Sequence, residues 1–130
     1  MKNKTSGWVF FADKDMLMAR AVTGNAELTG GVAFHCQQAI EKFLKAYLSE
    51  HDKEVRKTHD LLSLYSEAKN IQDWNLDEDM LKNISDIYIE LRYPVNIAMK
   101  PDGLLPSIEE AQSYWEFART VERVFRSLVK

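Results

Sequence analysis

The sequence predicts an all-α domain, built as a bundle of four long helices and one additional short helix. Apolar residues recur every three to four positions in five segments, which is the spacing of one face of an α-helix. No segment shows the alternation of apolar and polar residues that marks a half-buried strand. With 45% apolar residues in 130, residues 1–130 have enough core material for one such domain.

The composition and net charge of the chain exclude some classes of protein. The single cysteine, Cys36, excludes an internal disulfide framework and fits a reducing cytoplasm. No apolar stretch is long enough for a signal peptide or a membrane span, so we expect a cytoplasmic protein that does not enter a membrane. A net charge of −3 argues against the broad basic field of proteins that coat nucleic acid. Local basic patches remain, one of them around Arg56 and His59.

The first helix is predicted over residues 5–22, with Gly24 as its stop signal. Asp15 falls within the apolar stripe, where a carboxylate needs a Lys, Arg or His partner from a neighbouring helix. Alternatively, Asp15 lies at the edge of the face with its carboxylate in water. The apolar members of the stripe are Trp8, Phe11, Met18, Ala19 and Val22.

The second and longest helix is predicted over residues 26–50, and its broad apolar face implies packing against at least two other helices. Gln37 and Glu41 lie at the margin of that face, where polar residues make hydrogen bonds to neighbouring helices and hold the bundle in register. The remaining polar residues share an arc of about 80°. This polar stripe, which could line a cleft, contact a partner or face solvent, consists of His35, Gln38, Lys42 and Lys45.

Three further helices follow. Thr58 is expected to cap a short helix that begins near His59. An amphipathic helix starts at about Asp77 and ends before Pro94, which places Arg92 and Tyr93 on its last turn. After a long loop over 95–105, the spacing of Ser107 and Glu110 predicts a capping box at the start of the final helix.

Three separated segments resemble the HEPN family, the higher eukaryotes and prokaryotes nucleotide-binding domain. They are residues 33–46 (AFHCQQAIEKFLKA), 58–61 (THDL) and 91–94 (LRYP). The resemblance implies an up-and-down four-helix bundle, commonly a homodimer, found in prokaryotes and often encoded beside a minimal nucleotidyltransferase. Its fold is similar to the C-terminal, substrate-binding half of kanamycin nucleotidyltransferase. These features imply a substrate-binding subunit in a pair that resembles a toxin–antitoxin system.

Some HEPN proteins are instead toxins that cut RNA, and these carry an Arg followed after four to six residues by His. In this chain, residues 97–99 after Arg92 are Ile, Ala and Met, so the general acid/base residue of that motif is absent. Asn96 is the one polar residue nearby, and it cannot carry a proton in the same way. A self-sufficient ribonuclease is therefore not the favoured interpretation.

The candidate ligand-binding residues each have a structural alternative. Arg92 and Tyr93 could present a guanidinium to a phosphate, or Arg92 could simply favour the negative end of the helix dipole. His59 could help to hold a phosphate at a helix N-terminus, or pack beneath the preceding connector. The polar stripe could attract an anionic ligand through Lys42 and Lys45, or form the solvated side of its helix. No sequence motif implies a metal or cofactor.

Three functions follow as hypotheses. The leading one is a non-catalytic helical subunit that binds a nucleotide or nucleotide-linked substrate, as a homodimer, beside a separate nucleotidyltransferase. The second is a metal-independent ribonuclease in which Arg92 is assisted by His35, His59 or Asn96. The third is a module that only binds another protein. Aromatic residues in the second half of the chain exceed what one small core comfortably hides and favour an interface. They are Trp74, Tyr114, Trp115 and Phe117.

Overall fold

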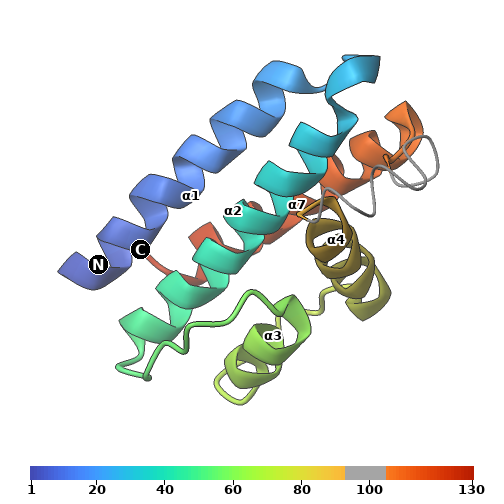
Figure 1. Cartoon of the computed structure of the whole chain (residues 1–130). Coiled ribbons are helices and arrows are strands. Elements are labelled where there is room, and N and C mark those ends of the chain that lie inside the picture. The colour runs from blue at the N-terminus through green and yellow to red at the C-terminus, as the bar shows by residue number, and fades with distance from the viewer. Residues whose placement is uncertain (93–104) are drawn as a thin grey trace.

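Every regular element in the described part of the chain, residues 1–92 and 105–130 of a computed structural model, is a helix (Figure 1). The predicted all-α bundle of four long helices and one short helix is therefore confirmed for these residues. The elements are α1 (Asn3–Val22), the 3₁₀ turn η1 (Ala26–Leu28), α2 (Thr29–Glu50), α3 (Leu61–Lys69), α4 (Glu78–Leu91) and α7 (Ile108–Leu128).

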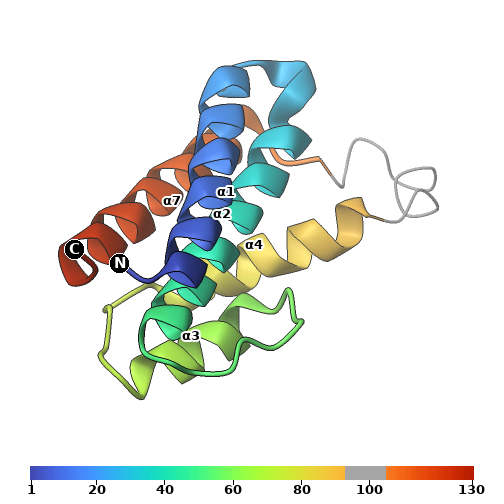
Figure 2. The same cartoon turned by 90° about the vertical axis from the view of Figure 1, so that its left-hand side faces the viewer.

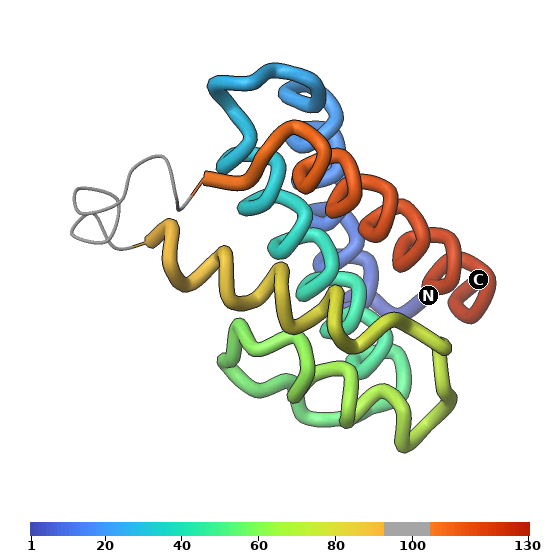
Figure 3. Tube along the Cα trace, turned by 90° about the vertical axis from the view of Figure 1, so that its right-hand side faces the viewer, coloured from blue at the N-terminus to red at the C-terminus, as the bar shows by residue number. Residues whose placement is uncertain are grey.

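α2 is the central helix, and it packs against α1, α3, α4 and α7. Figure 2 shows α1 in front of α2, with α7 and α4 on either side, and Figure 3 shows the same arrangement from the opposite direction. The side chains of Ile40, Phe43 and Leu44 on α2 are fully buried, as the width of its predicted apolar face requires. The N- and C-termini lie at the same end of the bundle in all three views.

α1 and α2 form an antiparallel pair that is fixed at both ends. At one end Gly24 has a φ of +88°, a left-handed conformation that glycine adopts without strain, and Asn25 caps the 3₁₀ turn by accepting from Glu27 N at 3.0 Å. At the other end Thr5 Oγ1 donates to Glu50 Oε1 at 2.9 Å. The long helix predicted from residue 26 begins as a 3₁₀ turn and becomes α-helical at Thr29.

The predicted apolar stripe of α1 is wrong at two of its five apolar members, whereas Trp8, Ala19 and Val22 pack against or within the core as predicted. Phe11 and Met18 are more than half exposed, whereas Ala12 and Ala19 are fully buried against the rest of the bundle. Small side chains at these two positions allow the backbones of α1 and α2 to approach closely. The large apolar residues of α1 lie at more than one angle around the helix, so hydrophobicity alone identified only part of the buried face.

Two helix caps were predicted from the sequence, and one of them is confirmed. Ser107 and Glu110 form the predicted capping box of α7, and Asp77 accepts from the first backbone amides of α4. The cap predicted for the short helix is wrong, because Asp60 accepts from Leu62 N and α3 begins at Leu61. Thr58 instead accepts from Asp60 N, which shapes the turn that precedes the helix.

The aromatic residues expected at an interface are mostly accommodated in the core. Trp74 and Tyr114 are buried, and the Trp74 ring meets Tyr47 edge to face at 5.0 Å. Trp115 and Phe117 are half-buried. Four of the exposed large apolar side chains lie on α1 instead, namely Phe10, Phe11, Leu17 and Met18. In the described residues, no helix has both the length and the apolar character that crossing a bilayer requires.

Candidate functional site

The polar stripe of α2 faces a carboxylate on α1. Asp15, whose side chain is 10% exposed, accepts from Lys42 Nζ at 2.5 Å and lies 2.9 Å from His35 Nδ1. A carboxylate removed from water needs such partners to offset its lost hydration. The predicted interhelical partner of Asp15 is therefore confirmed, and the alternative with the carboxylate in water is wrong.

A second buried carboxylate, Glu41, organises the segment that leads into α3. Glu41 Oε2 binds Lys45 Nζ at 3.0 Å, and Glu41 Oε1 lies 2.8 Å from Nδ1 of His59. Gln37 donates to the same Oε1 at 3.2 Å and to the backbone oxygen of His59 at 2.9 Å. Gln37 and Glu41 were predicted to bind neighbouring helices, but their partner outside α2 is His59, in the segment that precedes α3.

These contacts change the role of the polar stripe. Lys45 is 5% exposed, and the side chains of Lys42 and His35 are about one-fifth exposed. The interpretation as a solvated helix side is wrong for these residues, because acids from α1 and from α2 itself enclose them. Their positive charges are already balanced, so Lys42 and Lys45 offer little net attraction to an anionic ligand.

Three side chains from separate elements meet beside this buried network, at Tyr88 of α4. The ring of His59 lies 5.5 Å from the Tyr88 ring, and the guanidinium carbon of Arg92 lies 5.3 Å from its centroid. The imidazole of His59 is half exposed and Arg92 is exposed. Phe34, which is 38% exposed, borders the cluster at 5.6 Å from Tyr88. We call these four residues, together with Gln38, the His59–Arg92 site.

Local structure explains why these groups converge. Arg92 is the C-cap of α4 and follows Tyr88 by four residues, a spacing that brings two side chains together on one helix face. The imidazole of His59 is oriented by Glu41, which binds Nδ1, so Nε2 is the ring nitrogen that Glu41 does not bind. Gln38 continues the network by donating to Gln37 Oε1 at 2.7 Å.

The electrostatics of the site are set by burial and by two opposite charges. Burial raises the pKa of Tyr88 above its ordinary value, while the positive charge of Arg92 lowers it and the negative charge of Glu41 raises it further. Tyr88 is therefore a neutral hydroxyl at neutral pH, able to donate a hydrogen bond. The exposed guanidinium of Arg92 can bind an anion, and the half-exposed imidazole of His59, oriented by the buried Glu41, can exchange a proton with it.

Six of the seven candidate residues named from the sequence are in the described chain, and contacts connect all six. Phe34 links the two halves, since its ring lies 5.1 Å from that of His35 and 5.6 Å from that of Tyr88. Tyr93, the seventh, lies outside the described residues. Sequence reasoning missed Tyr88 and Phe34, although the spacing of Tyr88 and Arg92 was a signal for their contact.

Two other chemical roles are disfavoured by the structure. A phosphate at the N-terminus of α3, one role considered for His59, would meet the carboxylate of Asp60, which already caps that helix end. Cys36 is fully buried, and burial raises its pKa to about 12, so its thiol is not a nucleophile at neutral pH.

Across residues 1–92 and 105–130, no group of three or more His, Cys, Asp or Glu side chains is arranged to hold a metal ion.

Comparison with known proteins identifies one family. A family model described as HEPN domain matches residues 5–128, which is nearly the whole chain. Neither the curated proteins nor the solved structures gave a match. The matched range includes the whole buried network and all five residues of the His59–Arg92 site.

The buried and exposed ion pairs are expected to differ sharply in their effect on stability. Asp15→Asn leaves the Lys42 ammonium without a counter-charge in a mostly buried position, and we expect it to lower the free energy of unfolding by about 3 kcal/mol. Asp86→Asn removes the partner of Lys82 at an exposed 2.8 Å pair, and we expect a change within about 0.5 kcal/mol. Urea denaturation followed by circular dichroism measures both, and equal losses would contradict a structural role for Asp15.

Proposed function

Because the chain belongs to the HEPN family, we propose that it binds a nucleotide or nucleotide-linked substrate at the His59–Arg92 site. In this proposal the protein is a non-catalytic subunit, and a separate minimal nucleotidyltransferase carries out the reaction. The observation that carries the proposal is the convergence of Arg92 and His59, from different elements, on the ring of Tyr88.

The chemistry of the site fits a phosphorylated ligand with an aromatic base. Arg92 suits a phosphate because its planar guanidinium can donate two parallel hydrogen bonds. The half-exposed His59 adds a second donor when protonated. Phe34 and Tyr88 offer ring surface on which a base can stack. Since Lys42 and Lys45 are neutralised by carboxylates, Arg92 supplies most of the attraction for the anion.

Arg92→Gln is expected to weaken ATP binding about tenfold, because one charge-assisted interaction with phosphate is lost. Isothermal titration calorimetry with ATP measures the dissociation constant. Arg123→Gln is the matched control, since Arg123 is an exposed arginine of α7 outside the site and its replacement removes the same charge. Equal affinities for the wild type and Arg92→Gln would contradict the proposed site.

We also propose that the subunit is a homodimer that forms a complex with its nucleotidyltransferase. Four large apolar side chains on α1 support this, because each is about half exposed and so many on one helix are more than isolated apolar residues on a surface. They are Phe10, Phe11, Leu17 and Met18.

Size-exclusion chromatography with light scattering is expected to give the mass of a dimer. We also expect a nucleotidyltransferase to be encoded beside the gene and to co-elute with the protein. Replacing both Phe10 and Phe11 by Glu should give a monomer, because two charges would then lie within the apolar contact. Ile89→Glu, at an exposed apolar residue of α4, is the control and should remain dimeric. A monomeric wild type, or absence of co-elution at micromolar concentration, would remove the support for this assembly.

The Glu41–His59 pair favours one alternative function, a metal-independent ribonuclease. A carboxylate bound to one imidazole nitrogen orients the ring so that the other nitrogen can transfer a proton, and His59 could thus replace the histidine that is absent after Arg92. Arg92 would then stabilise the charge that develops on the phosphate.

For the leading proposal, the purified protein is expected to leave total RNA intact, as followed by gel electrophoresis over several hours. Cleavage that disappears in both Arg92→Ala and His59→Ala would establish the ribonuclease instead. Cleavage that persists in both variants would exclude this site as its origin. If the protein neither cleaves RNA nor binds ATP but still binds a protein partner, it is a module that only binds another protein.

A further inference from the structure

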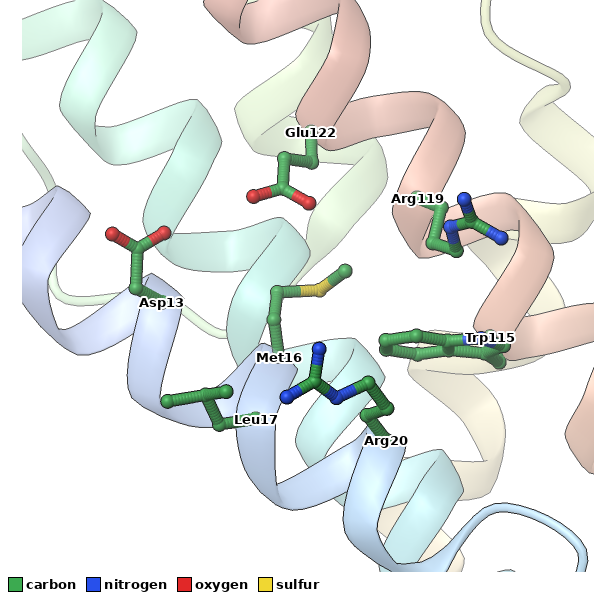
Figure 4. Close-up of a pocket in the computed structure, with 7 residues that line it drawn as sticks. All are labelled: Asp13, Met16, Leu17, Arg20, Trp115, Arg119 and Glu122. Atoms are coloured by element: carbon green, nitrogen blue, oxygen red, sulfur yellow. The ribbon is translucent and has the colours of Figure 1, made fainter.

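A groove of about 580 Å³ lies between α1 and α7, away from the His59–Arg92 site. Met16 and Leu17 of α1 and Trp115 of α7 give it an apolar lining, and Leu17 is about half exposed (Figure 4). α1 and α7 make few contacts with each other because α2 lies between them. The groove is thus a space that packing of these two helices leaves open.

An ion-pair cluster closes one end of this groove. Arg126 of α7 binds Asp13 of α1 at 2.5 Å and Glu122 of its own helix at 3.0 Å. Figure 4 shows the carboxylates of Asp13 and Glu122 together at the end of the groove away from Trp115. Because Arg126 links the two helices, a long peptide helix cannot run through the groove without breaking these pairs.

The other end of the groove is cationic. Figure 4 shows Arg20 from α1 and Arg119 from α7 near Trp115. Within residues 1–92 and 105–130, Arg20 has no carboxylate within 4.0 Å, and the one ion pair of Arg119 is a 3.8 Å contact with Glu116 between half-exposed side chains. Such a pair is worth little in water. Both guanidiniums are therefore available to an anion.

We propose that this groove binds a small aromatic anion, with its ring against Trp115 and Met16 and its phosphate or carboxylate between Arg20 and Arg119. The volume falls within the range of about 300–1,000 Å³ that is typical of small-molecule sites. Arginine binds phosphates and carboxylates through paired hydrogen bonds, and indole rings stack on flat apolar groups. The site shares no residue with the His59–Arg92 site, so a result that contradicts one proposal leaves the other unaffected.

Phenyl phosphate is the first probe, and two-dimensional NMR of ¹⁵N-labelled protein follows the indole N–H of Trp115, which is assigned from its absence in Trp115→Phe. We expect a saturable shift with phenyl phosphate. Inorganic phosphate, which lacks the ring, and benzyl alcohol, which lacks the charge, should each bind about tenfold more weakly or not at all. Benzoate as a further arm distinguishes a carboxylate from a phosphate as the preferred head group.

Arg20→Gln and Arg119→Gln should each weaken phenyl phosphate binding about tenfold. Arg123→Gln on the same helix and Arg92→Gln at the other site remove the same charge and should leave it unchanged. The proposal is overturned if phenyl phosphate causes no saturable shift at about 10 mM, or if all four variants bind it equally. Because Arg20 and Arg119 are exposed, their replacement does not disturb the core, and circular dichroism confirms that each variant is folded.

Discussion

The buried carboxylate of Glu41 is the contact on which the arrangement around α2 depends. One of its oxygens binds Lys45 on the same helix, and the other binds His59 in the segment before α3. A carboxylate in this position is unfavourable unless hydrogen-bond donors replace its water, so a chain path that brings His59 to it is favoured. The same contact that determines the path of the chain therefore orients the imidazole of the candidate site.

Asp15 is the corresponding buried carboxylate between α1 and α2, and it binds two side chains of α2. Lys42 and His35 lie on the same stripe of α2 as Lys45, so one row of polar residues pairs with an acid on each side. Buried ion pairs add little net stability compared with apolar contacts, but a partner lost from such a pair is costly. The polar stripe thus acts mainly by making other registers of α1 against α2, and other chain paths into α3, less stable. The fully buried apolar residues of α2 supply the hydrophobic stabilisation.

The sequence predicted the helices, the capping box of α7 and the need of Asp15 for a partner, because these depend on local spacing and on the cost of a buried charge. It did not predict that Lys42 and Lys45 would be enclosed, since a helical wheel shows which residues share an arc but not which acids lie opposite. The burial of Ala12 on α1 was missed for a related reason: its small side chain permits close packing, which is a property of the helix pair. Asp60 and Thr58 are both good caps, and tertiary contacts determined which of them was used.

Charge balance determines how the His59–Arg92 site can work. Lys45 already neutralises Glu41, so protonation of His59 adds a net positive charge beside Arg92 and favours an anionic ligand. A proton-accepting role needs the opposite state, a neutral imidazole with a free lone pair on Nε2. Glu41 stabilises the orientation required for both, but anion binding through His59 and proton abstraction by it compete for the same nitrogen. A ligand phosphate that accepts a hydrogen bond from Nε2 therefore prevents proton abstraction by the same nitrogen, so the two proposed functions are alternatives at this site.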